Sequence, residues 1–306
     1  MAYSLADDES FSDGLRRIVL EQIDKVLDNL KPTVRNKDEA IRHARVDIKK
    51  IRAVLRLISD TLGDKTYREE DTAYRDAARA LSKERDSAAM LEILDSLVEH
   101  FSDQLTTDPF GSVRTVLLRS KRVRQQDRRG AMTKMGKSLR QASQRVAKWP
   151  KLDHHQALAL GLKRVFREGR RSFATAYDQP SMETFHEWRK QVKHLLYQTK
   201  VLGPLWPSFM EALAAELEAL GKQLSEDHDL AILREKVLEQ LEESENRTEI
   251  EALLGLIDQR RNELHVTARV LGARIYAEKP RAFAARTKAY WQAWRSEVKV
   301  DPIAAG

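Results

Sequence analysis

The sequence has no cysteine and few of the residues that interrupt helices, with 12 glycines and 8 prolines among 306 residues. Without cysteine, disulfides and thiolate chemistry are excluded, and a reducing compartment suits the chain. No run approaches 18 apolar residues, so we expect no membrane-spanning segment. The acidic start of the chain has no apolar stretch, so we expect no secretion signal and a cytoplasmic location.

Common signatures of catalysis are missing as well. The sequence has no Gly-x-Ser-x-Gly elbow, no glycine-rich phosphate loop and no His-Glu-x-x-His pair. The triplets 153–155 and 227–229 combine aspartate with histidine, but neighbouring side chains on a helix point about 100° apart and do not converge on one ion. We therefore expect neither a metal nor a cofactor, and we interpret these triplets as helix caps or solvent-facing residues.

Charged residues are abundant, at 33% of the chain, and the formal net charge is +7. The charge is unevenly distributed: residues 111–150 contain twelve basic residues and one acid, Asp127, whereas residues 211–263 are rich in Glu and Asp. This composition, with few breakers, predicts a helical protein. We expect a first helix after Ser12 or Asp13 that ends at Pro32, and a basic helix over about 113–148, either continuous or interrupted near Gly130.

The segment Ala40–Leu62 combines an apolar stripe with a row of cations. At steps of three and four, one helical face carries apolar residues that predict burial: Ile41, Ala44, Ile48, Ile51, Leu55, Ile58 and Leu62. One residue along, the same steps carry Arg42, Arg45, Lys49, Arg52 and Arg56. Like charges at this spacing repel, costing a few tenths of a kcal/mol per pair. The row therefore indicates an anionic ligand.

The same pattern returns in the second half. An offset of 144 places Arg42 on His186, Arg45 on Arg189, Lys49 on Lys193 and Arg56 on Lys200, and LSKERDSA at 81–88 aligns with LSEDHDLA at 224–231 at an offset of 143. Two matches at nearly one offset favour duplication. We predict an all-α protein of two tandem four-helix bundles related by a pseudo-two-fold, residues 1–150 and 151–306, with the two cationic rows lining a shared groove or pore.

Each candidate residue also has a purely structural interpretation. Exposed rows of Lys and Arg are often only solvated faces, but these rows adjoin the core, recur, and contain only Asp47 as an interleaved acid. His186 is either a core histidine or, as the counterpart of Arg42, a ligand contact. Asp86 and Asp229 occupy equivalent places, and we favour a structural or arginine-orienting role for them over acid–base catalysis.

The segment HEWRKQVKHLLY resembles the CHAD domain, named for conserved histidines on α-helices. The matching residues are His186, Arg189, Lys190, Lys193, Leu195 and Tyr197, and in the first half Arg45, Lys49, Lys50, Ile51 and Arg52. Arg85-Asp86, His228-Asp229 and the segment 277–295 are also similar to the family. Where the family places its first histidine, this chain has Arg42, which favours electrostatic binding over histidine chemistry.

The resemblance implies binding of inorganic polyphosphate in a basic channel and association with polyphosphate granules. The expected contacts are Arg42, Arg45, Lys49, Lys50, Arg52, Arg56, His186, Arg189, Lys190, Lys193, Tyr197 and Lys200, with Arg164, Arg167 and Arg171 on the preceding helix. We expect a non-enzymatic protein. The alternatives are a nucleic-acid backbone binder that uses the basic stretch 111–150, and a phosphohydrolase or phosphotransferase that acts on polyphosphate.

Overall fold

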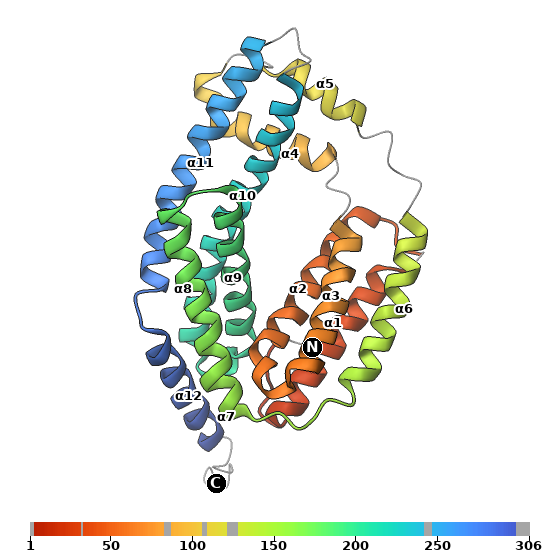
Figure 1. Ribbon diagram of the computed structural model, residues 1–306, viewed down its shortest axis with the longest axis vertical. Coiled ribbons are helices and arrows are strands. Elements are labelled where there is room, and N and C mark those ends of the chain that lie inside the picture. The colour runs from red at the N-terminus through yellow and green to blue at the C-terminus, as the bar shows by residue number, and fades with distance from the viewer. Residues whose placement is uncertain are drawn as a thin grey trace, which may run out of the picture.

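The computed structural model describes residues 3–31, 33–82, 87–105, 109–120, 128–241 and 247–297, and over these ranges every regular element is a helix (Figure 1). The expectation of an all-α protein is confirmed. The first half contains α1 (Phe11–Asn29), α2 (Lys37–Leu62), α3 (Asp64–Ser82), α4 (Ser87–His100), the 3-10 turn η1 (Ser102–Gln104), α5 (Gly111–Ser120) and α6 (Arg128–Val146). The second half contains α7 (His154–Gln156), the π-turn η2 (Ala157–Gly161), α8 (Leu162–Asp178), α9 (Met182–Val201), the 3-10 turn η3 (Gly203–Leu205), α10 (Pro207–Leu241), α11 (Arg247–Ile275) and α12 (Pro280–Glu297).

Helix ends follow short-range capping chemistry. The Asn36 side chain accepts a hydrogen bond from the Glu39 amide at the start of α2, and Gly63 ends this helix with φ 78°, a conformation that glycine adopts without strain. The expected start of α1 was wrong, because Ser10 is the cap and Ser12 lies inside the helix. The Ser12 hydroxyl instead accepts from the Leu152 amide at 2.6 Å, which ties α1 to the segment before α7.

The main hydrophobic core combines helices from both halves of the sequence. The predicted stripe of α2 is buried there: Ala44, Ile48, Ile51, Leu55 and Ile58 are fully buried, and only Ile41 is partly exposed. Residues of α1, α3, α6, α8, α9 and α12 join the same cluster. One continuous core therefore supports both motif helices.

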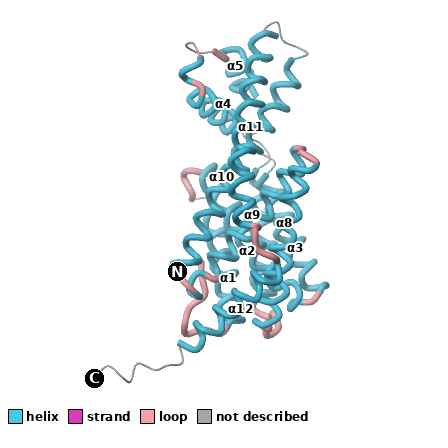
Figure 2. The backbone as a smooth tube through the Cα atoms, turned by 90° about the vertical axis from the view of Figure 1, so that its left-hand side faces the viewer, coloured by secondary structure: helices cyan, strands magenta, loops and turns pink. Residues whose placement is uncertain are grey.

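A second, smaller core lies at the far end of the molecule. It joins α4 and α5 to the C-terminal part of α10 and the N-terminal part of α11 (Figures 1 and 2). The 35 residues of α10 correspond to roughly 50 Å of helix, which is long enough to pass from one core to the other. This core, too, is built from residues of both sequence halves.

The predicted basic helix over 113–148 is corrected by the structure. Within the described residues it is two helices, α5 and α6, which pack in different places (Figure 1). Val113 and Leu117 of α5 are buried in the smaller core, whereas Met135 and Leu139 of α6 are buried in the main core. Gly130 lies inside α6, and residues 121–127 fall outside the described ranges. Apolar spacing is the same for one helix or two, so only packing distinguishes them.

The contact between α2 and α9 is close and includes backbone. The Gln198 Nε2 amide donates to the Ala53 carbonyl oxygen at 2.9 Å, and both residues are fully buried. An unpaired buried amide or carbonyl would cost about 1–3 kcal/mol, so this bond restricts how the helices cross. The turn η2 packs on the next part of α2, where Gly161 lies against the Leu57 carbonyl.

Replacement of Gly161 by alanine should destabilise the fold. An added Cβ would overlap the Leu57 carbonyl oxygen, and backbone cannot move aside as a flexible side chain can. We expect the free energy of unfolding to fall by about 3 kcal/mol in urea titrations followed by circular dichroism. Gly255→Ala is the control: nothing lies within 4 Å of that Cβ position on α11, so higher helix propensity should raise stability by about 0.5–1 kcal/mol. Equal stability of the two variants would contradict the close η2–α2 contact.

Candidate functional site

The cationic row of α2 lies along the edge of the core, as its sequence position predicts. Arg45, Lys49, Arg52 and Arg56 are half-buried, while Arg42 near the start of the helix is exposed. The aliphatic parts of such side chains can pack on apolar neighbours while their charged ends stay near water. The row is therefore held in place by packing along most of its length.

The corresponding row of α9 lies beside α10. Arg189, Lys193 and Lys200 face α10: the Arg189 Nε donates to the Ser225 Oγ at 3.0 Å, Lys200 pairs with Glu218, and the Lys193 ammonium lies over Gly221. Burial lowers the pKa of Lys193, and the neighbouring charge of Arg189 lowers it further. Positive charge is thus concentrated here despite its cost.

The other side of α9 meets α2 at His194. Burial lowers the pKa of the His194 imidazole well below its usual value, and the charges of Arg56, Arg52 and Lys190 act in the same direction. Its Nδ1 is sealed from solvent, with no hydrogen-bond partner in the described part of the chain. The charges of two cations of α2 and one of α9 thus act on a single side chain. We call Arg52, Arg56, Lys190 and His194 the α2–α9 cationic cluster.

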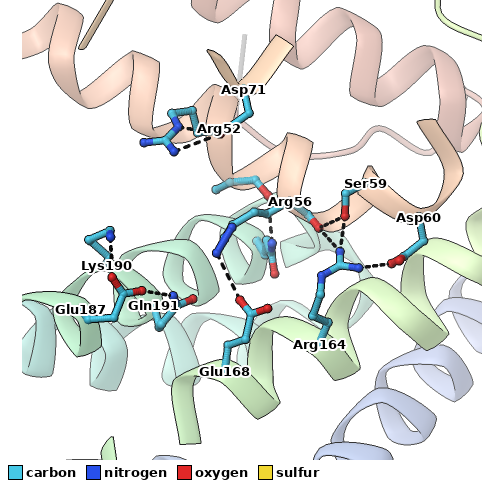
Figure 3. Close-up of polar contacts among 12 residues, drawn as sticks. Arg52, Arg56, Ser59, Asp60, Asp71, Arg164, Glu168, Glu187, Lys190 and Gln191 are labelled. Carbon is cyan, nitrogen blue, oxygen red and sulfur yellow. Dashed lines mark hydrogen bonds and ion pairs between the residues drawn. The ribbon is translucent and has the colours of Figure 1, made fainter. Parts of the chain in front are cut away.

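Carboxylates accompany each cation of this cluster (Figure 3). The Arg52 Nε donates to the Asp71 Oδ1 of α3 at 3.0 Å, and the Arg56 Nη2 donates to the Glu168 Oε2 of α8 at 3.2 Å. Lys190 pairs with Glu187 one turn earlier on α9. The cluster therefore carries its own compensating charge.

Sequence reasoning missed several of these neighbours. Glu187 could have been found, because it stands three residues before Lys190 on one helix face. His194 directly follows Lys193 in the motif, and the offset of 144 places it on Lys50, an expected contact, so the repeat could have selected it. Glu168 and Asp71 come from other helices, and no local spacing connects them to α2.

Some predicted contacts point elsewhere. The Lys50 Nζ donates to Asp47 Oδ1 at 2.9 Å and lies over the Tyr3 ring, which also packs edge-on against Tyr197. Arg164 pairs with Asp60 and donates to the Arg56 carbonyl oxygen at 2.6 Å, so it binds the end of α2 (Figure 3).

Three further predicted contacts are on α8 and α9 and do not belong to the cluster. Arg167 and Arg171 are exposed on α8. His186 lies beside His228 of α10, with ring centroids 4.4 Å apart.

The acidic candidates also have definite positions. Asp229 is half-buried on α10, whereas Arg85 and Asp86 lie outside the described residues. Asp227, which the sequence offered only as part of a triplet, is buried and binds the Arg261 Nε and the His265 Nε2 of α11, both at 2.8 Å. Among the residues that the structure describes, no group of three His, Asp or Glu is placed to hold a metal ion.

Two surface depressions touch the predicted residues at their edges. One, of about 450 Å³, includes Lys50 and His43 between α1 and α2. The other, of about 550 Å³, includes Lys200 beside η3 and α10. Neither depression joins the two cationic rows.

A comparison with protein families matches the CHAD domain to residues 17–238. The chain belongs to the CHAD domain family. The match includes both motif helices and ends within α10, so α11 and α12 lie outside it, as does the CHAD-like segment expected at 277–295. A search of curated proteins found no match. Over its described helices, the CHAD chain has none that is long and apolar enough to cross a membrane.

The pKa of His194 predicts a pH-dependent stability. Because the folded pKa is lowered, the unfolded chain takes up a proton that the folded protein excludes, so stability is present above about pH 6.5 and is lost as the pH falls. The loss should approach about 1.4 kcal/mol per pH unit below that point. Urea titrations at about pH 7.5 and about pH 5.5 measure it.

His194→Gln should reduce this pH dependence. His43→Gln, which changes an exposed histidine of α2, is the control and should keep the wild-type dependence. If both variants lose stability with acid as the wild type does, His194 is not the group that titrates.

Proposed function

We propose that the protein binds inorganic polyphosphate, without catalysis, along the face where α2 and α9 meet. The observation that carries this proposal is the cluster itself: Arg52 and Arg56 of one motif helix and Lys190 of the other lie where α2 and α9 meet (Figure 3), and the charges of all three act on His194. Membership of the CHAD family supports it, since the family resemblance implies polyphosphate as the ligand. The proposed contacts extend from the cluster along both rows, to Arg45 and Lys49 on α2 and to Arg189 and Lys193 on α9.

The arrangement suits a polyanion better than a single phosphate. One phosphate needs a few donors, such as the amides of one helix start, whereas these cations follow two helices of 26 and 20 residues. Arginine can bind phosphate oxygens through two hydrogen bonds, and lysine acts as a point charge. Repeated cations therefore correspond to repeated phosphates.

We infer that the two rows arose by duplication of one helical unit. The helix pairs α1–α2 and α8–α9 each pack together, and each contributes its second helix to the shared contact. The proposed halves are not independent, because α4 and α5 pack on α10 and α11. Association with polyphosphate granules in the cytoplasm would follow from the proposed binding.

Replacement of four cations by alanine tests the site: Arg45, Lys49, Arg189 and Lys193. We expect the variant to lose retention on immobilised polyphosphate while its helical circular dichroism stays unchanged. Wild-type binding should weaken steeply with salt, because the ligand releases counterions when it binds. A quadruple variant that binds like the wild type would rule out these four cations as contacts.

The matched control removes the same charge from the basic stretch that favoured nucleic acid. Lys137 and Arg140 of α6 are exposed, as are Lys148 and Lys151 in the loop that follows. Their replacement by alanine should leave polyphosphate retention nearly unchanged. If it weakens DNA binding instead, and long polyphosphate fails to displace DNA at equal charge concentration, then a nucleic-acid backbone is the ligand.

A further inference from the structure

We propose that Asp71, Glu168 and Glu187 act as internal counter-ions of the α2–α9 cationic cluster and set the minimum length of polyanion that it retains. The inference rests on the proposed function and deepens it, because it concerns which polyanions the same site accepts. Its basis is the placement of one carboxylate beside each cation of the cluster.

The three carboxylates come from three different helices. Asp71 on α3 binds Arg52, Glu168 on α8 binds Arg56, and Glu187 on α9 binds Lys190 (Figure 3). Glu168 and Arg56 are 112 residues apart in the sequence. Cation and carboxylate are thus matched one to one where the two motif helices meet.

These pairs are exposed enough to exchange partners. The side chains of Arg56 and Glu168 are 27% and 34% exposed, and those of Lys190 and Glu187 are 46% and 44% exposed. Ion pairs that reach solvent contribute little to stability, because water and salt compete with them. A ligand oxygen can therefore replace the carboxylate on each cation.

Glu187 carries a real negative charge in this setting. Partial burial opposes its ionisation, but hydrogen bonds from Lys190 and Gln191 and the nearby charge of Arg56 prevail and lower its pKa. Glu187 therefore faces cations of both helices, and its charge would also repel an approaching phosphate.

When a ligand must displace a carboxylate from each cation that it binds, long polyanions are favoured over short ones. A single phosphate exchanges one ion pair for another and must also meet the full cost of association. A polyphosphate chain incurs the free-energy cost of association only once, and each later contact forms at high effective concentration. The carboxylates weaken every contact, so only chains that reach several cations bind well.

The test compares Glu168→Gln, Glu187→Gln and the double variant with the wild type, using tripolyphosphate and long-chain inorganic polyphosphate as probes. Each replacement should tighten binding of tripolyphosphate up to about fivefold, since it removes a competing pair of the solvent-exposed kind. The plot of log affinity against log salt should steepen by up to about one for each carboxylate removed. A merely structural role would not change that slope.

Glu278→Gln is the matched control. Glu278 pairs with Arg286 at similar exposure, 29% and 31%, but it lies in the loop before α12 and its ion pair involves no cation of the cluster. The Glu278→Gln substitution changes the net charge by the same amount as each cluster variant. It should leave both the affinity for the two probes and the salt slope close to wild type.

The outcomes separate the two proposals. If the wild type binds neither probe, the proposed function fails. If it binds long polyphosphate but Glu168→Gln and Glu187→Gln behave like Glu278→Gln, or bind more weakly, the carboxylates are structural and the counter-ion role is wrong. Tighter binding of tripolyphosphate with a steeper salt slope supports it.

Discussion

The buried contact between α2 and α9 is the constraint on which the site depends. The hydrogen bond from Gln198 to the Ala53 carbonyl leaves little freedom in how the helices cross, because both groups are sealed from water. Each helix also inserts its apolar side into the same core. Arg52 and Arg56 of α2 and Lys190 of α9, which would repel one another, are thereby held close together (Figure 3).

The cost of this arrangement is visible in the titrating groups. Burial and neighbouring cations lower the pKa values of both Lys193 and His194, so the positive charges around these two side chains lie where solvent screens them poorly. Asp71, Glu168 and Glu187 offset part of that cost at the cluster. Positive charge is therefore concentrated beside a packed core and only partly compensated by carboxylates. This is the physical basis of the proposed ligand preference.

Much of the fold followed from local pattern. The stripe of α2 is buried, Gly63 ends that helix, and all described elements are helical, because apolar spacing and capping act within a few residues. A continuous basic helix over 113–148 was wrong, as was an interruption near Gly130, because α5 and α6 satisfy the same apolar spacing while they pack in different cores. Lys50 and Arg164 carried the expected charge, yet each is already paired with a carboxylate, Asp47 and Asp60 respectively.

The sequence by itself determined the helical class, the two cationic rows and their position at the edge of the core, since each depends on residues three or four apart on one helix. Tertiary structure alone decided that α9 divides its cations between α10 and α2, that His194 lies among Arg52, Arg56 and Lys190, and that α8 supplies Glu168. The physical reason is distance along the chain: side chains more than a hundred residues apart meet only through packing, which helical periodicity does not encode.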